Sequence, residues 1–422
     1  MSTICLIRPI CPIKRRHRSV LLLAAACIVF CNFTRAEEPI SYWPAGTADD
    51  TPWTGRLQHV DAHLAILTVR GSPAERGEAH CKLLGNEVAM LVKSVRACIL
   101  KGNTEDHYKI CIDGARTMAK FTDADVVAEL KACASAANVD PDELMLAQLF
   151  GDVNRAKGFS SLCSSFAAFG EATVEGKLLI GRNFDYAGHG LEGGLPLILQ
   201  EIPTGDGAGR SFVTLGYAGI LNGWTAMNAN GLCASNNTLY GGKDTLEGMS
   251  TCFLLRKIVE RAGTVEEGVA LIQKASRACT TGMLIAGKNA GGKWDARFVE
   301  YDSQKAAVVE PVKGVVEATN RRQKLTFDAS PPSPPAVECS RYATLKLYLG
   351  AHEGKLSFDD AKQNPVGASG VYMGINLHCA LLDPPGQRFR AAFADGDGKP
   401  AAEKVFRDFD VKASSVVLHK KE

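Results

Sequence analysis

The chain has 422 residues, 46% of them hydrophobic and 22% charged, which is typical of a globular protein with one large or two ordinary domains. The formal net charge of +2 comes from the first 36 residues, which hold six Lys or Arg and no acid. Residues 37–422 carry 42 basic and 46 acidic groups, a charge of −4. The composition therefore does not indicate a nucleic-acid-binding surface, and no metal-binding spacing of Cys and His occurs.

The start of the chain predicts an export signal. Basic residues at 14–18 precede an apolar run from Val20 to Phe30, and Ala36 ends a Thr-Arg-Ala site of the kind that signal peptidase cuts. The uncharged stretch is shorter than the roughly 20 residues needed to span a bilayer. We expect residues 1–36 to be removed and the protein to be secreted or periplasmic, without an integral membrane span. A lipid-modified Cys27 and an uncleaved anchor are the alternatives.

Residues 37–162 are predicted to be mostly helical after an irregular, proline-containing start at 37–72. A capping box at 72–75 opens a helix that runs to about Leu100. Two further helices are indicated by the acidic, capping-type sequences at 122–125 and 140–143.

An oxidising destination permits disulfides between the ten cysteines that follow the leader. Their spacing forms no dense framework. Cys98 and Cys111 flank a polar segment and are the pair that we single out as able to form a bridge.

From Cys163 onward, short strands separated by Gly, Asp and Asn turns alternate with pairs of helices. Two stacked antiparallel sheets, each with a helical layer on its outer face, would produce this order of strands, two helices, strands, two helices and strands. The prediction is an α+β fold with four layers, αββα. Strands are expected at 164–169, 177–184, 196–202, 211–217, 223–227, 282–286, 296–301, 306–310, 314–318, 371–377, 389–393 and 405–409, and helices at 251–261, from 264, at 341–349 and from 357.

Cys163 is the candidate nucleophile. A thiolate attacks amide carbonyls well, but a free Cys has a pKa of about 8.5, so a base must take its proton. If Cys163 were the first residue of a chain, its own α-amino group, with a pKa of about 7.7–8.0, could be that base. The amine is freed when the Leu162–Cys163 bond breaks, a step that the same thiol can perform. Arg182 could then hold negative charge near the sulfur, and Asp185 could orient the new ammonium.

Several short sequences around these residues resemble, in order, those of the acyl-coenzyme A:6-aminopenicillanic acid acyltransferase (isopenicillin-N acyltransferase) family of N-terminal-nucleophile hydrolases. Choloylglycine hydrolase, penicillin V acylase and acid ceramidase are more distant relatives. The resemblance runs from about Gly71 to Asp383. It is carried by Cys163-Ser164-Ser165, Gly181-Arg182-Asn183-Phe184-Asp185-Tyr186, Gly216-Tyr217-Ala218-Gly219, Met227-Asn228 with Gly231-Leu232, Ala318-Thr319-Asn320 and Ser340-Arg341-Tyr342.

The resemblance implies a self-processing cysteine enzyme with an N-terminal-nucleophile hydrolase sandwich. Cys163 would be the nucleophile, Arg182 and Asp185 its partners, and Arg341 a late active-site arginine. Asn237 is the candidate oxyanion donor, with Asn236 in reserve. Residues 37–162 would form a pro-segment or α-chain and residues 163–422 the catalytic β-chain, so that self-cleavage would give an α/β heterodimer.

The sequence departs from the family pattern in two places. Leu162 stands where Gly often precedes the nucleophile, and Arg321 stands where His often follows Thr-Asn.

The implied reaction is hydrolysis or acyl transfer at non-peptide amide bonds of small acyl amides, through an acyl-thioester. The resemblance implies no cofactor or metal, with acyl-coenzyme A as a possible co-substrate. Acyl and amine specificity stay open between a β-lactam, an acyl-amino acid, a bile-acid conjugate and a lipid amide.

Other interpretations of Cys163 are an inert buried thiol and a papain-type pair with His378, 215 residues away. Two alternatives keep the same fold: a lipid amidase or phospholipase B-like hydrolase, and a secreted binding protein without catalysis.

Overall fold

The computed structural model describes residues 53–153, 162–188, 191, 194–326, 339–359, 365–368 and 370–419. The predicted export signal, with Cys27 and Ala36, lies outside the described residues. Residues 50–422 form one compact unit with no division at Cys163. Among the described helices, none is long and apolar enough to cross a bilayer.

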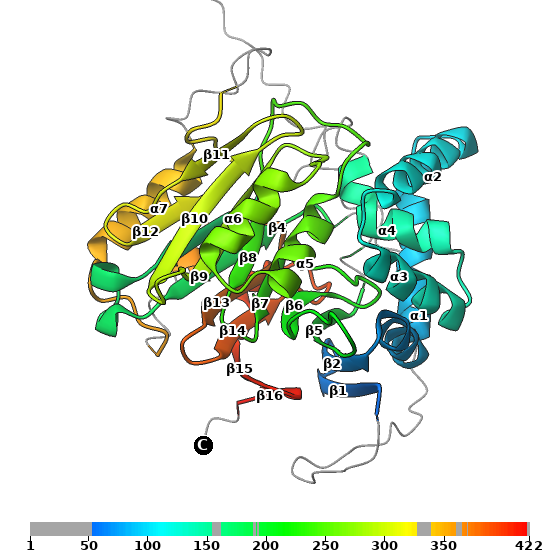
Figure 1. Ribbon diagram of the computed structural model, residues 1–422, viewed down its shortest axis with the longest axis horizontal. Coiled ribbons are helices and arrows are strands. Elements are labelled where there is room, and N and C mark those ends of the chain that lie inside the picture. The colour runs from blue at the N-terminus through cyan, green and yellow to red at the C-terminus, as the bar shows by residue number, and fades with distance from the viewer. Residues whose placement is uncertain are drawn as a thin grey trace, which may run out of the picture. The chain divides into compact units, whose positions relative to one another are not determined.

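Two sheets form the centre of this unit (Figure 1). Among the strands named here, neighbours run antiparallel except for β2 and β5, which are parallel. The nine-stranded sheet has the order β1 (Gly55–Asp61), β2 (Leu64–Gly71), β5 (Pro196–Pro203), β6 (Phe212–Tyr217), β7 (Thr225–Asn228), β8 (Cys233–Thr238), β9 (Thr281–Lys288), β10 (Trp294–Tyr301) and β11 (Ala306–Val309). The seven-stranded sheet has the order β12 (Val315–Ala318), β3 (Ser164–Ala168), β4 (Leu179–Asp185), β13 (Asn376–Asp383), β14 (Arg388–Phe393), β15 (Arg407–Lys412) and β16 (Ser415–Leu418).

The sheets pack against each other through an apolar core. Ile180 of β4, Leu215 of β6 and Phe298 of β10 belong to one buried cluster drawn from both sheets. Burial of each such side chain contributes roughly 1.5–3 kcal/mol to folding before entropy is subtracted. The core therefore holds the two sheets face to face, as the alternation of short apolar strands predicts.

Helices cover the outer faces of both sheets. The helices α5 (Thr251–Arg261) and α6 (Val265–Lys274) pack on β7 to β10 of the nine-stranded sheet, and α7 (Ser340–Ala351) packs on β12 of the other sheet. Ser250 and Thr264 cap α5 and α6 by accepting hydrogen bonds from backbone N–H groups in the first turn. The predicted α+β fold with four αββα layers is confirmed.

The segment before Cys163 adds four helices: α1 (Pro73–Leu100), α2 (Glu105–Ala119), α3 (Ala124–Ala136) and α4 (Pro141–Val153). Figure 1 shows these helices grouped at the right of the view, with α1 beside β1 and β2. The capping box at α1 is present, since Ser72 accepts from Glu75 N and Glu75 accepts from Ser72 N.

The prediction that residues 37–72 are irregular is wrong for the described part, which forms β1 and β2. The prolines of this segment all precede β1. We extended the irregular structure that they indicate to the residues after them, so no strand was predicted there. β2 pairs in parallel with β5, with Ala65 opposite Leu197. It is buried on both faces, so it lacks the alternation that identifies a half-exposed strand.

Some boundaries near the C-terminus also differ. The strand predicted at 371–377 is displaced to β13, β16 was not predicted, and residues 357–359 are not helical, with 360–364 outside the described residues.

Cys98 and Cys111, which we singled out as able to form a bridge, are not joined. Cys98 lies in α1 and Cys111 in α2, and both are thiols, while a disulfide joins Cys81 of α1 to Cys133 of α3. The segment expected to be a polar loop is mostly α2, which points Cys111 into the helical core. Sequence spacing alone does not show which helices are neighbours.

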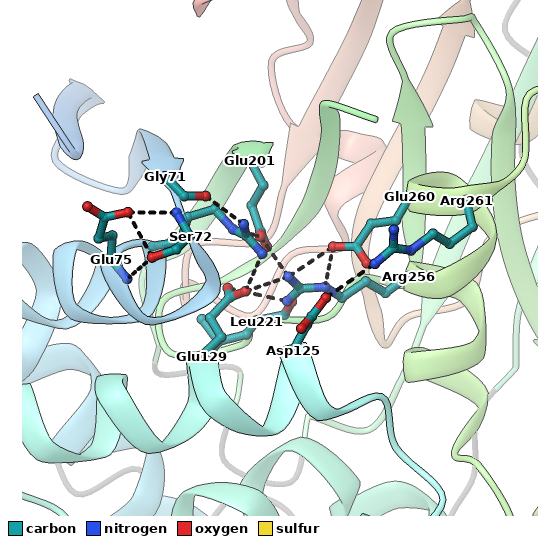
Figure 2. A network of polar contacts seen from close by, with 11 residues as sticks. Gly71, Ser72, Glu75, Asp125, Glu129, Glu201, Leu221, Arg256, Glu260 and Arg261 are labelled. Atoms are coloured by element: carbon teal, nitrogen blue, oxygen red, sulfur yellow. Dashed lines mark hydrogen bonds and ion pairs between the residues drawn. The ribbon is translucent and has the colours of Figure 1, made fainter. Parts of the chain in front are cut away.

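A buried cluster of charges joins the segment before Cys163 to the rest of the chain. Arg76 of α1 donates to Glu129 of α3 at 2.8 Å and to Glu201 of β5 at 2.9 Å. Arg256 of α5 donates to Glu129 at 2.6 Å, to Glu201 at 2.7 Å and to Glu260 at 3.2 Å. Figure 2 shows Arg256 among these three carboxylates. We call these five residues the buried charge cluster.

Candidate active site

Cys163 lies immediately before β3, at the point where the chain enters the seven-stranded sheet between the edge strand β12 and β4. Its side chain is fully buried. The Leu162 N–H donates to the Asp185 carbonyl oxygen at 2.7 Å, which extends the β3–β4 ladder past Cys163. The ladder thus places the Leu162–Cys163 peptide bond beside the end of β4, where Arg182 and Asp185 lie.

Arg182 brings a positive charge to the sulfur. Its Nη2 lies 3.1 Å from Sγ of Cys163, and the guanidinium is completely buried between the sheets. Its Nη1 donates to Oδ1 of Asn237 at 3.5 Å. A buried cation in contact with sulfur stabilises negative charge that develops there.

Asp185 lies on the opposite face of β4 from Arg182. Its Oδ1 accepts from Asn376 Nδ2 at 2.8 Å and from Met373 N at 3.2 Å. Its Oδ2 has no hydrogen-bond donor within the described part of the chain and lies 3.7 Å from Nη1 of Arg341. Burial raises the pKa of Asp185 to about 6, against the hydrogen bond from Asn376, so the carboxyl is mainly ionised at pH 7.

Arg341, in the first turn of α7, closes the site from the outer side. Its Nη1 donates to the Cys163 carbonyl oxygen at 3.0 Å, and its Nη2 donates to Oδ1 of Asn320 at 2.8 Å. Asn320 is in turn fixed by donating to the Thr238 carbonyl at 2.7 Å. Arg341 therefore positions the backbone on the C-terminal side of the nucleophile.

Asn237 of β8 reaches the site from the nine-stranded sheet. Its Oδ1 accepts from Ser165 Oγ at 2.7 Å and from Arg182, while its Nδ2 points to the Ala318 carbonyl at a long 3.4 Å. Asn236 faces the other side of β8, and its Oδ1 has no hydrogen-bond partner among the residues described. The five predicted site residues, Cys163, Arg182, Asp185, Asn237 and Arg341, are thus linked by contacts into one cluster.

Sequence reasoning did not assign three further residues of this cluster. Asn320 belongs to one of the short sequences that carry the family resemblance, and its place between Thr319 and Arg321 was the available indication. Ser165 likewise belongs to the sequence Cys163-Ser164-Ser165 of that resemblance, whereas Asn376 offered no such indication, because it acts on Asp185 through a contact that folding creates.

A cavity of about 70 Å³ lies beside the cluster. Phe184, whose ring lies 5.9 Å from Cζ of Arg182, forms part of its wall and stacks on Trp224 at 4.6 Å. Gln148 and Phe150 of α4 form another part, so residues from both sides of Cys163 build this cavity.

His378 is a buried strand histidine. Its Nε2 is 2.8 Å from Thr225 Oγ1, and its ring stacks on Phe184. Burial, and then the charge of Arg182, lower its pKa well below the usual value, so the ring is neutral. These contacts favour a packing role over the papain-type pair with Cys163.

The model of the acyl-coenzyme A:6-aminopenicillanic acid acyl-transferase family matches residues 172–395, which is 224 of 422 residues. The match includes Arg182, Asp185, Asn237 and Arg341 and begins nine residues after Cys163.

Two curated relatives are each 24% identical. They are an uncharacterized protein of Archaeoglobus fulgidus, over 271 residues (58% of this chain and 44% of that protein), and the protein dcd1A of Dictyostelium discoideum, over 280 residues (59% and 61%). The alignments thus span less than two thirds of either relative.

The solved structures to which the chain is similar include the following three. A Caenorhabditis elegans N-acylethanolamine-hydrolyzing acid amidase ortholog has a TM-score of 0.40 at 17% identity, covering 53% of this chain and 93% of that one. A mutant of the conjugated bile acid hydrolase of Clostridium perfringens has 0.39 at 11% (62% and 97%), and penicillin V acylase of Agrobacterium tumefaciens has 0.37 at 14% (60% and 93%).

Proposed function

Because the chain belongs to the acyl-coenzyme A:6-aminopenicillanic acid acyltransferase family, we propose that it is an exported, self-processing cysteine amidohydrolase or acyltransferase acting on small acyl amides. The observation that carries this proposal is the 3.1 Å contact between Arg182 Nη2 and the buried Cys163 Sγ. Arg341 donates to the carbonyl oxygen of the same cysteine and lies 3.7 Å from Asp185. The leader and the Cys81–Cys133 disulfide support export to an oxidising compartment.

Maturation would begin with attack of Cys163 Sγ on the Leu162 carbonyl carbon. The C–N bond to Cys163 breaks, its nitrogen takes the thiol proton, and a thioester links Leu162 to the sulfur. Water then hydrolyses the thioester and releases a Leu162 carboxylate and the free thiol. The α-amine of Cys163, now protonatable, would become the donor that Oδ2 of Asp185 lacks before cleavage.

In turnover, the α-amine would take the Cys163 proton as the thiolate attacks the substrate carbonyl. The tetrahedral oxyanion would be held by Asn237 Nδ2, whose 3.4 Å bond to Ala318 O is weak enough to be exchanged. The amine part of the substrate leaves with a proton from the α-ammonium of Cys163. The acyl group then passes from the thioester to water or to another amine. No cofactor enters this cycle; acyl-coenzyme A would enter it as an acyl donor.

The test is intact-mass measurement of the purified protein combined with turnover of a panel of acyl amides, with and without an amine acceptor. We expect two chains that break between Leu162 and Cys163, and loss of both cleavage and turnover in Cys163→Ala. Cys252→Ala is the matched control, because Cys252 is also a buried thiol that lines the cavity but has no place in the proposed steps. Turnover that survives in Cys163→Ala would contradict the proposal.

A further inference from the structure

The connection between β6 and β7, residues 218–224, forms one wall of the 70 Å³ cavity beside the candidate active site. We call it the β6–β7 turn. Its residues in the cavity wall are Ile220 and Trp224, and Trp224 stacks on Phe184 at 4.6 Å. Gly219 has a φ of +86°, and a Cβ atom built there would lie 2.9 Å from a methyl carbon of Leu91. The turn is therefore packed closely against α1, a helix that precedes Cys163.

Side chains from two helices pair the backbone of this turn. The Gly219 N–H donates to Nε2 of His80 in α1 at 3.1 Å, and the Leu221 carbonyl accepts from Nη1 of Arg256 in α5 at 2.6 Å. Both side chains are buried. Because buried backbone groups need such partners, each of these side chains fixes one point of the turn.

Gln148 of α4 fixes the turn at two points. Its Nε2 donates to the Gly219 carbonyl at 2.8 Å, and its Oε1 accepts from the Leu221 N–H at 2.9 Å. Its own backbone carbonyl accepts from Asn222 Nδ2 at 3.4 Å. The side chain is buried and also belongs to the cavity wall. Pairing both backbone groups requires a donor and an acceptor on one side chain, which the amide of Gln supplies.

Gln148 lies in the segment that cleavage before Cys163 would separate from the β6–β7 turn. We propose that Gln148 is a positioning residue for the reaction, which holds the wall formed by Ile220 and Trp224 and thereby sets which acyl amides fit the cavity. The segment before Cys163 would then take part in substrate selection after cleavage as well as in folding. This inference rests on the proposed function, because that function makes the cavity a substrate pocket.

The first test does not use turnover. Gln148→Met keeps the length of the side chain and removes both hydrogen bonds to the turn. Hydrogen exchange of the full-length protein, followed by mass spectrometry, should be at least tenfold faster in peptides that contain Leu221. Gln200→Met is the matched control, because Gln200 is a buried glutamine of β5 that bonds Thr68 and the Lys412 carbonyl instead of the turn. In that variant the turn should exchange as in wild type.

The second test measures selectivity. We compare kcat/KM for the best substrate of the acyl-amide panel with kcat/KM for homologues that are longer by two methylene groups in the acyl or the amine part. A ratio of two such values does not depend on the fraction of folded enzyme, so a merely structural defect leaves it unchanged. Gln148→Met should change at least one ratio about tenfold, an effect of the size that a methylene group has in an apolar pocket. Gln200→Met should keep both ratios.

Gln148→Glu tests the same position by rescue. A protonated carboxyl group can donate to the Gly219 carbonyl and accept from the Leu221 N–H as the amide does, whereas a carboxylate has no donor. The selectivity of this variant, compared with wild type at each pH, should therefore approach the wild-type value as the pH is lowered from 8 to 5.

Three results would overturn the inference: wild-type exchange of the turn in a folded Gln148→Met, wild-type selectivity in Gln148→Met despite faster exchange, or altered selectivity that persists in Gln148→Glu at pH 5. Absence of turnover in wild type would instead contradict the proposed function. The exchange measurement would still decide whether Gln148 holds the turn.

Discussion

The two carboxylate oxygens of Asp185 have different surroundings. Asn376 and Met373 hold Oδ1, whereas Oδ2 has only the distant guanidinium of Arg341. In the proposed reaction the amide nitrogen of Cys163 becomes an ammonium group as the preceding bond breaks. An ionised Asp185 would stabilise that ammonium, and a protonated one would not.

We therefore predict that self-cleavage slows as pH falls through about 6, the pKa to which burial raises Asp185. Asp185→Asn keeps the shape and an acceptor oxygen for Asn376 but removes the charge. It should slow cleavage roughly 10- to 100-fold and remove the pH dependence near 6, because a charged hydrogen bond is worth about 1.5–3 kcal/mol. Time courses of cleavage between pH 4.5 and 8, followed by mass spectrometry, measure this. A cleavage rate that is equal in both proteins at every pH would remove Asp185 from the mechanism.

Asn237 and Asn236, which are neighbours in β8, give a second prediction about single residues. Asn237 contacts Ser165 and Arg182 within the cluster, while Asn236, on the other face of β8, lines the neighbouring cavity. Loss of one oxyanion donor costs about 10²–10³ in kcat. We expect that loss in Asn237→Ala and a smaller change, mainly in KM, in Asn236→Ala. Steady-state kinetics on one acyl amide distinguishes them, and the reverse order would make Asn236 the oxyanion donor.

Among elements, β5 is where the two parts of the chain meet, since it pairs with β2 and carries Glu201 of the buried charge cluster. Burial raises the pKa of Glu201 to about 8, in spite of Arg256. Burial acts in the same direction on Glu129, but Arg256 and Arg76 outweigh it and lower the pKa of Glu129.

The pKa of Glu201 leads to a prediction for stability. A raised folded-state pKa means that the folded protein binds the proton more tightly than the unfolded chain. The stabilisation is complete below the ordinary pKa of about 4.5 and is lost as pH rises through about 8. The contribution of Glu201 to the free energy of unfolding should fall between pH 7 and 8, by at most about 1.4 kcal/mol per unit, and level off above pH 9.

Glu201→Gln should make this slope shallower, because the amide does not titrate in this range; buried thiols such as Cys233, whose pKa burial also raises, supply the remainder. Denaturant unfolding between pH 7 and 9 measures the effect. The matched control is Glu247→Gln on an exposed loop, which should keep the wild-type slope. A wild-type stability that is flat over this window would contradict the assignment.

Helices and strands differ in how far the sequence predicts them. The capping sequence at Ser72 and the periodic apolar residues of α1 were sufficient, because both are local features. β2 was missed because its partner, β5, lies more than a hundred residues further along and makes it a strand buried on both faces. The same limit applies to the disulfide, since Cys81 meets Cys133 only after α1 and α3 pack together.

For the whole molecule, the candidate site was predictable where a known family pattern supplied its residues. Cys163, Arg182 and Asp185 lie within 23 positions of one another and are brought together by one hairpin, β3–β4. Asn376 is 191 residues from Asp185, and nothing local to either residue indicates their contact. Only the assembled sheet, with β13 beside β4, places them together.

A prediction for the whole molecule concerns the products of cleavage. The Cys81–Cys133 disulfide lies within the part before Cys163 and does not join the two products. We expect the products to co-elute in size-exclusion chromatography at the mass of the intact chain, and to separate in SDS without reductant. Cys163→Ala, as the uncleaved control, should give one band in both conditions. A fragment that elutes alone under native conditions would show that the segment is released.

Because β2 pairs with β5, cleavage before Cys163 would leave the two products joined within one sheet. Strands from both products are neighbours in the same sheet, with the apolar core on one side of them and the Arg256 guanidinium nearby. In the proposed maturation, scission would free the backbone at Cys163 while β2 stays paired with β5. The proposed cleavage would then change the freedom of the chain ends at Cys163 alone, because the contacts between the two products lie elsewhere in the sheet.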